Sequence, residues 1–361
     1  MNNKYVLLCS VFAFALAGMN VQAKVSQQEA NKLGTSLTPF GSIKAGNKNK
    51  TIPEWTGGLT EAPKGYEGSG QHHIDPFAGD EIKFTIDESN YQGFKKYLTP
   101  GQYALFETYT NTFKMNVYPT HRSHAMPEWV IKNTRDNATT AQLSKGGVGI
   151  KDAYGGIPFP ILHGSNEEKA LQTMWNHLTR WRGIFVTSRS TEVAVQRDGD
   201  YSPITKQQEI FFNFHNPKGS FKKMDNILFY FLTFNKAPAR LAGGALLVHE
   251  TLDQTKDARQ AWDYNSGQRR VRRAPNLAYD SPIASSDNTR TADDTDMYNG
   301  APDRYDWEYK GVKEFFIPYN NYKVGAQGVK YSDLVMPGHL NPDYVRWELH
   351  RVHVVEATLK P

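Results

Sequence analysis

Residues 227–234 have the sequence ILFYFLTF, a run without any charged side chain. Its length and its aromatic content predict a β-strand. Because side chains alternate across a strand, the run is apolar on both faces, and we expect apolar material on each side of it. One side is predicted to meet the core, and the other to meet a helix or a pocket for an apolar ligand. Phe229 and Phe231 are therefore candidate ligand-binding residues.

Strand-like segments continue on both sides of this run. From Gly183 onward apolar residues recur with a period of two, and turn residues separate the segments. The segments lie near residues 184–197, 207–214, 226–234, 243–252, 258–264, 268–273, 312–317 and 345–357. Because no helix long enough to connect parallel strands intervenes, we predict an α+β, mainly β fold built on one large, curved antiparallel sheet. The apolar positions of the last segment change parity, which predicts a β-bulge near His350–Arg351.

Two helices are predicted before these strands. Thr99 is a suitable N-cap, with Pro directly after it, for a helix that continues over residues 102–114. Ser165 and Glu168 form a capping box, because each side chain can satisfy the other residue's backbone N–H group. The helix that this box opens is predicted to run to about Arg182, with a single apolar stripe that faces the core.

The first residues are typical of a secretory signal peptide. Lys4 provides the positive start, residues 5–17 form the apolar run, and Ala23–Lys24 is the predicted cleavage site. The run is shorter than the roughly 20 apolar residues of a transmembrane helix. The sole cysteine, Cys9, lies inside the run, so we expect residues 1–23 to be removed and the mature chain to be neither lipidated nor disulfide-bonded.

The mature chain is predicted to have two parts. Residues 24–86 are punctuated by Gly and Pro and predict an irregular N-terminal arm that lies over a larger body. Residues 87–361 are expected to form a single domain. Its composition is that of a folded chain, since the whole sequence is 39% apolar and 22% charged. The net charge of +5 over 361 residues is too diffuse to indicate a nucleic-acid partner, and we expect none.

Common catalytic signatures do not occur in the sequence. We find no G-x-S-x-G elbow, no phosphate-binding P-loop and no G-x-G-x-x-G motif after a strand. Histidines are spaced i and i+3 in His121–His124 and in His350–His353, but neither pair has a neighbouring Cys or carboxylate to complete a metal site. The acidic residues 293–300 lack the bidentate Glu of a calcium loop. We therefore expect no metal and no cofactor, and we assign no catalytic residue.

The most distinctive cluster surrounds a predicted hairpin turn at Asn265–Gly267, where Gly is placed for a positive φ. Aromatic residues precede the turn and four arginines follow it. Arginine side chains suit carboxylate or phosphate headgroups and form cation–π pairs with aromatic rings. Cross-strand ladders, with pairing to Asp257, Asp263 or Asp280, would explain the same pattern. Together with Trp347 of the last strand, this cluster adds to the candidate ligand-binding set the residues Trp262, Tyr264, Arg269, Arg270, Arg272 and Arg273.

Several stretches resemble the hallmarks of an uncharacterised exported proteobacterial family that is labelled outer-membrane lipoprotein-sorting-like and grouped with LolA and LolB. They are residues 154–160, 261–275, 303–307, 317–320 and 341–352, and the resemblance covers nearly the whole mature chain. It implies a periplasmic protein with a LolA-like half-barrel, whose concave face is covered by a helical lid. In LolA and LolB such a sheet shelters the acyl chains of lipoproteins. The resemblance also implies RND-type exporters and outer-membrane proteins as partners, because family members are often encoded beside them.

We therefore expect a periplasmic carrier for a hydrophobic or lipid-like amphiphile, which assists envelope lipid transport or lipoprotein sorting. Aromatic side chains would hold the apolar body and arginines would meet an acidic headgroup. One alternative is a hydrolase of lipids or glycans, which requires some of His163, His249, Asp296 and Glu348 to converge. The other is a structural accessory subunit of an RND-type export system. An apolar cavity favours the carrier over the accessory subunit.

Overall fold

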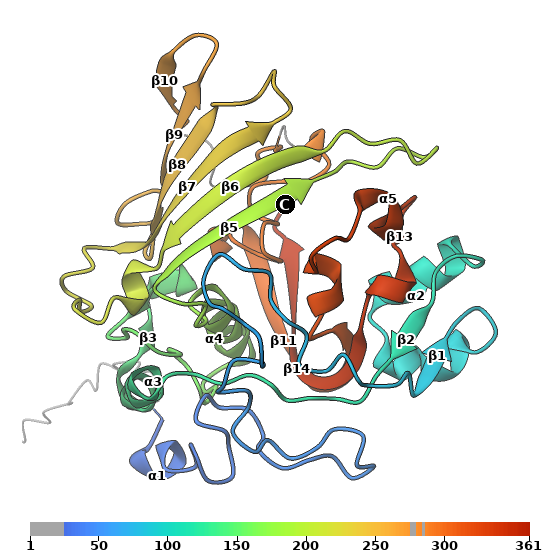
Figure 1. Cartoon of the computed structure of the whole chain (residues 1–361). Helices are drawn as coiled ribbons and strands as arrows, with labels where there is room; N and C mark the ends of the chain where they lie inside the picture. The colour runs from blue at the N-terminus through green and yellow to red at the C-terminus, as the bar shows by residue number, and fades with distance from the viewer. Residues whose placement is uncertain (1–24, 275–278, 284–285) are drawn as a thin grey trace, which may run out of the picture.

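The computed structural model describes residues 25–274, 279–283 and 286–361 (Figure 1). The predicted signal peptide, residues 1–23, lies outside the described residues. Within the described part of the chain, no helix has the length and hydropathy needed to cross a bilayer. The segment that follows, up to residue 83, contains the short helix α1 (Gln27–Ala30) and otherwise consists of turns and bends.

A six-stranded antiparallel meander forms one side of the molecule. Its spatial order, β10-β9-β8-β7-β6-β5, is the order of the chain, so each strand pairs with the next. The strands are β5 (Phe185–Glu192), β6 (Ile204–Phe211), β7 (Ile227–Ala237), β8 (Ala245–Thr251), β9 (Gln260–Asn265) and β10 (Arg270–Arg273). The run ILFYFLTF begins β7, next to the centre of the sheet. The predicted fold class, mainly β with an antiparallel sheet and packed helices, is confirmed.

A second sheet has the order β1-β2-β14-β11. Its strands are β1 (Phe84–Ile86), β2 (Met115–Val117), β11 (Tyr305–Pro318) and β14 (Trp347–Leu359). Two further pairs lie outside the main sheets, β3 (Gln142–Leu143) with β4 (Ile150–Lys151) and β12 (Val335–Met336) with β13 (His339–Leu340). The strands near residues 312 and 345 were predicted in the same sheet as the meander, but they belong to this one. A period of two identifies a strand without specifying its neighbour.

The predicted helix starts are confirmed. Thr99 caps α2 (Pro100–Thr108) and Ser165 caps α4 (Asn166–Leu178), and both form capping boxes. The ends differ, because α2 stops at Thr108 and α4 stops at Leu178 rather than near residues 114 and 182. The other helices are α3 (Glu128–Thr140) and α5 (Tyr331–Leu334).

Two apolar cores hold the sheets in place. The larger core joins the stripe of α4 to Phe229 of β7 and Trp307 of β11, so α4 lies between the two sheets (Figure 1). The smaller core joins α2 to the second sheet and includes Phe106, Trp347 and Ile52 of the N-terminal segment. Both cores cross between segments that are far apart in sequence.

Two local predictions were wrong. β14 pairs with β11 in unbroken register from Trp347 to Val354, so there is no bulge at His350–Arg351, and the irregularity lies at Lys310 of the partner strand. The change of apolar parity has another cause, since Leu349 packs in the smaller core whereas Val355 packs against the larger one. In the β9–β10 turn the positive φ falls on Arg269, at 53°, and not on Gly267.

Candidate functional site

Phe229 and Phe231 lie on the side of β7 that faces the larger core. Phe229 is buried, and its ring centroid lies 6.0 Å from that of Phe212. Phe231 is partly buried against the same cluster and pairs with Ile210 of β6 and Val248 of β8. Both side chains therefore contribute to the core of the sheet.

The opposite side of the sheet, which we call the open face, carries a row of partly exposed apolar side chains. Strand register places on it Phe185, Phe211, Tyr230, Leu232, Phe234, Leu247, Trp262, Tyr264 and Val271. Ring contacts run across four strands from Phe211 to Tyr230, His249 and Trp262, with centroid distances of 6.3, 4.7 and 4.8 Å. None of these side chains is fully buried, and Val271 retains 63% exposure.

The predicted ligand set is therefore divided. Trp262 pairs with Arg273 and Tyr264 pairs with Val271, so these side chains share the open face. Arg270 and Arg272 are exposed on the other side of β10, and Arg269 lies in the turn. Trp347 is buried in the smaller core, in a different sheet. The structure does not bring the nine predicted residues into one site.

The residues of the alternative hydrolase site also lie apart. His249 packs between Tyr230 and Trp262 on the open face. The backbone N–H of His163 donates to Gln172 of α4, and Asp296 accepts from Arg180 and Arg182. Glu348 lies in β14, within a separate group of hydrogen bonds.

A cavity of about 360 Å³, which we call the arm pocket, lies between the N-terminal segment and the second sheet. Its lining residues are mostly apolar or aromatic and come from the N-terminal segment, the loop after β2, and strands β11 and β14. They are Phe40, Gly41, Ser42, Ile43, Ile52, Trp55, Arg122, His124, Met126, Ile157, Arg180, Val312, Ile317, Tyr319, His350, Arg351 and His353.

Glycine allows the N-terminal segment to close on this pocket. Gly41 has a φ of +96°, and a Cβ atom there would lie 2.0 Å from the carbonyl oxygen of Pro160. Trp55 fixes the same segment, since its Nε1–H donates to the carbonyl of His124 at 2.9 Å. The ring of Phe40 packs edge-on against both Trp55 and His124. The apolar wall is therefore held in place by contacts between segments far apart in sequence.

The arm pocket unites the two histidine-containing motifs of the sequence. The backbone after β2 follows β14, because Tyr118 N–H donates to the carbonyl of Trp347 at 2.9 Å and Thr120 Oγ1 to that of Leu349 at 3.0 Å. This brings residues 121–124 beside residues 350–353, and both motifs contribute an arginine and histidines to the lining. Their likeness was the available signal, but neither segment is complete as a site alone.

The charge of the arm pocket is positive. Three arginines and three histidines line it, and no described lining residue is acidic. Arg180 is paired with Asp296, and Arg351 lies 3.7 Å from Glu314. Arg122 instead donates to the carbonyls of Ile43 and Lys44 at 2.7 Å each, and no described carboxylate lies within ion-pair distance of it.

Burial and charge both act on the groups of this wall. Burial lowers the pKa of Arg122, and the neighbouring positive charge of Arg351 lowers it further. Burial also lowers the pKa of His124 and of His353, which favours their neutral forms. The wall therefore contains an unbalanced guanidinium charge among apolar side chains, and that arrangement favours an anionic group of a ligand.

A buried group of charges supports the pocket from behind. The Glu348 carboxylate accepts hydrogen bonds from Arg346 Nε at 2.6 Å, Asn320 Nδ2 at 3.0 Å and the His121 backbone at 2.8 Å. His350 Nε2 lies 3.0 Å from its second oxygen. Burial alone would raise the pKa of Glu348, but hydrogen bonds from His350, Asn320 and Arg346 hold that pKa below its ordinary value. These contacts fix the ring of His350 at the pocket.

This group is not arranged as a metal site. Arg346 also contacts Asp80, and His121 Nε2 lies 2.8 Å from the same carboxylate. Across the described ranges, no set of three His, Cys, Asp or Glu side chains is placed to hold a metal ion.

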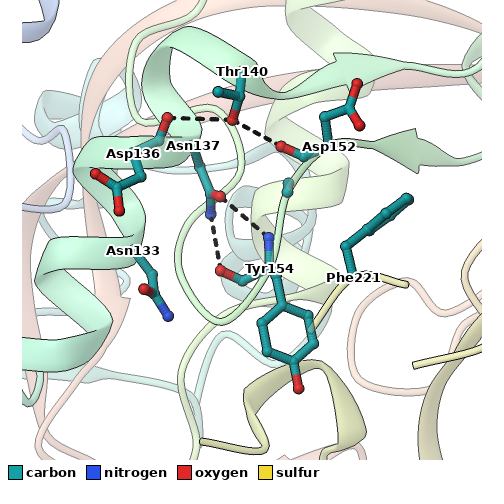
Figure 2. Close-up of a pocket in the computed structure, with 8 residues that line it drawn as sticks. Asn133, Asp136, Asn137, Thr140, Asp152, Tyr154 and Phe221 are labelled. Carbon is teal, nitrogen blue, oxygen red and sulfur yellow. Dashed lines mark hydrogen bonds between the residues drawn. The ribbon is translucent and has the colours of Figure 1, made fainter. Parts of the chain in front are cut away.

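A second hollow of about 510 Å³ lies between α3 and the loop after β4 (Figure 2). Most of its polar side chains already bond the backbone of that loop. Asn137 accepts from the Tyr154 N–H at 3.1 Å, and Thr140 donates to the carbonyl of Asp152 at 2.8 Å. Because these groups are engaged in shaping the loop, the arm pocket is the stronger candidate site.

Comparisons with known proteins give one clear relationship. The family model described as "Protein of unknown function (DUF1329)" matches residues 85–361. An uncharacterized protein of Pseudomonas aeruginosa is 46% identical over 358 residues, which cover 99% of this chain and 77% of that protein.

Two solved structures are similar over part of the chain. A DUF1329 family protein from Desulfovibrio piger is 15% identical, with a TM-score of 0.34 over 55% of this chain and 63% of that one. A domain from Vibrio parahaemolyticus, described as an outer membrane lipoprotein-sorting protein domain, is 18% identical, with a TM-score of 0.29 over 43% and 57%. The match spans less than two thirds of either solved chain, and neither likeness bears on the site.

Proposed function

We propose that this chain, which belongs to the DUF1329 family, binds and carries a hydrophobic or lipid-like amphiphile that ends in an acidic group. One observation supports the proposal above the others. The arm pocket combines an apolar wall with Arg122, a half-buried guanidinium that no described carboxylate pairs. A ligand with an apolar body and one carboxylate or phosphate would satisfy both parts of the wall.

The apolar part of the pocket sets the size of the ligand. A cavity of about 360 Å³ lies within the range of small-molecule sites, which span roughly 300–1,000 Å³. Each buried CH₂ group contributes about 0.8 kcal/mol, so a chain of about eight carbons contributes about 6 kcal/mol before the entropic cost of association. Binding of that strength is reversible, as carriage requires.

The acidic end of the ligand would lie at the arginines. Arg122 and Arg351 are close enough for the charge of one to lower the pKa of the other, and an anion between them would relieve that repulsion. Both also bond carbonyls of the N-terminal segment, at Ile43, Lys44 and Ala45. Movement of this segment would therefore open the pocket and release the ligand.

The cellular setting belongs to the same proposal. A signal peptide over residues 1–23, an arm over 24–86 and a single domain over 87–361 describe an exported carrier whose arm closes the site. The resemblance to lipoprotein-sorting proteins supports a periplasmic role in lipid transport or lipoprotein sorting. An RND-type exporter and an outer-membrane protein are the proposed partners.

Calorimetric titration with decanoate and decanol tests the proposal. Both ligands are expected to bind the native chain. Arg122→Gln is expected to weaken decanoate about tenfold or more, because it removes a charge-assisted hydrogen bond, and to leave decanol nearly unchanged. Arg122→Lys keeps the charge but loses the planar fork, so an intermediate loss is expected. Trp55 provides a fluorescence signal inside the pocket.

The matched control is Arg189→Gln, which removes an exposed arginine of β5. It is expected to leave both affinities unchanged. Equal losses of decanoate and decanol in Arg122→Gln would assign Arg122 a purely structural role. Absence of binding by both ligands to the native chain would reject the pocket as the site.

A further inference from the structure

We infer that one corner of the six-stranded sheet docks on an anionic lipid bilayer. The corner consists of the β7–β8 turn and the β9–β10 hairpin, residues 235–245 and 262–274, and we call it the basic corner. Figure 1 shows the β9–β10 hairpin at the outer end of the sheet, away from the helices. The inference does not depend on the proposed function, because the arm pocket is lined by other residues.

The basic corner concentrates positive charge. Its only acidic residue is Asp263, whereas its cations are Lys236, Arg240, Arg269, Arg270, Arg272 and Arg273. All six are exposed, and among the described residues none of them forms an ion pair. The formal charge of the corner is therefore +5, from six cations and one acid, which equals the net charge of the whole sequence.

The two turns are held together as one surface. Ser266 Oγ donates to the carbonyl of Ala242 at 3.0 Å, and Ala245 pairs with Tyr264. Gly243 has a φ of +83°, and a Cβ atom there would lie 3.3 Å from Ser266. The cations of both turns thus act on the same neighbouring surface.

Apolar side chains lie among these cations. Val271 is 63% exposed, and Trp262, Tyr264 and Phe234 are partly exposed on the same face. Tryptophan and tyrosine favour the boundary between water and lipid, while arginine and lysine reach to anionic headgroups. The corner therefore matches a bilayer surface in both its apolar and its charged parts.

Protection of a sheet edge and docking of an acidic protein each account for less of this surface. β10 is an edge strand, and charges on an edge strand prevent its pairing with other chains. That role leaves Arg240 in the neighbouring turn without a purpose. An acidic protein would need a socket for an anchoring side chain, but neither cavity is lined by a residue of the corner.

Vesicle flotation tests the inference with the whole mature chain. Binding is expected to vesicles of phosphatidylcholine with phosphatidylglycerol, and not to phosphatidylcholine alone. Each arginine removed is expected to weaken binding about fivefold, so Arg270→Gln with Arg272→Gln should weaken it about 25-fold. The control removes the same charge elsewhere, with Lys222→Gln and Lys223→Gln in an exposed loop, and should retain native affinity. Thermal unfolding establishes that both double variants are folded.

Three outcomes would overturn the inference. They are failure of the native chain to bind anionic vesicles, native affinity in the arginine variant, and equal weakening in the lysine control. The last result would indicate diffuse attraction without a defined surface. Binding of an acidic protein to the corner in the absence of any vesicle binding would assign the surface to a protein partner.

Discussion

Strands β7 and β14 each place one face in an apolar core, but their second faces meet different surroundings. The second face of β7 is apolar and stays partly exposed, with Tyr230 and Leu232 on it. The second face of β14 is polar and buried, and Glu348 on it has 0% exposure. An apolar pattern therefore does not ensure burial, and a charged pattern does not ensure exposure.

The difference arises from what each strand has beside it. β7 lies within the meander, where sheet neighbours cover its edges and α4 contributes to the core on one side. β14 lies between β11 and the chain after β2, so its carboxylate receives several hydrogen-bond donors. Burial of a charge is tolerated where such partners compensate for the loss of water.

Glu348→Gln tests the largest part of this contrast. Loss of the carboxylate leaves Arg346 and His350 with a neutral partner in a buried site, so we expect about 4 kcal/mol of lost stability. Urea unfolding measures this change. A cost close to that of an exposed substitution would show that the buried charges are not coupled.

The pH dependence of the same variant gives a second readout. Because the folded state lowers the pKa of Glu348, its contribution to stability is present above the ordinary value of 4.5 and is lost as the pH falls through the folded pKa. The gap between native protein and Glu348→Gln should therefore narrow only below about pH 4.5. A constant gap into strong acid would contradict the assignment.

Phe229→Ala tests the core-facing side of β7. Removal of a buried phenylalanine leaves a cavity, and we expect a loss of about 3 kcal/mol in the free energy of unfolding. The same substitution should leave decanoate binding to the folded protein unchanged, because Phe229 does not line the arm pocket. Loss of binding at full stability would return Phe229 to the ligand site.

Tyr230→Ser tests the open face and is the smallest effect in the series. Tyr230 is partly exposed and contacts His249 edge-on, so we expect a loss of about 1 kcal/mol or less. Chemical unfolding of this variant beside Phe229→Ala compares adjacent residues of one strand. Equal costs would show that both faces of β7 are packed.

Local features of the fold were predictable from the sequence. The capping boxes at Thr99 and Ser165 and the order of the meander depend on residues close together in the chain. The helix ends were less predictable, since α4 stops at Leu178 although its apolar stripe continues to Trp181. The ends depend on tertiary contacts that compete with helical continuation.

The candidate site was only partly predictable. An apolar surface with arginines beside it was expected, and Trp262, Tyr264 and Arg273 do share the open face. Phe229 and Trp347 were assigned to the ligand set because aromatic residues suit both a core and a pocket. Pattern alone cannot separate these roles, since the side chain is the same in each.

The sequence by itself determined which segments are helices and strands, where helices begin, and which segments are apolar, because these properties arise from neighbours along the chain. The tertiary structure alone decided which face of β7 is covered and how the strands divide into two sheets. It also brought His121 beside Glu348, 227 residues away, and so assembled the arm pocket from two motifs. Such contacts depend on how the elements pack, and an apolar or charged side chain specifies the kind of partner it requires without specifying which partner it meets.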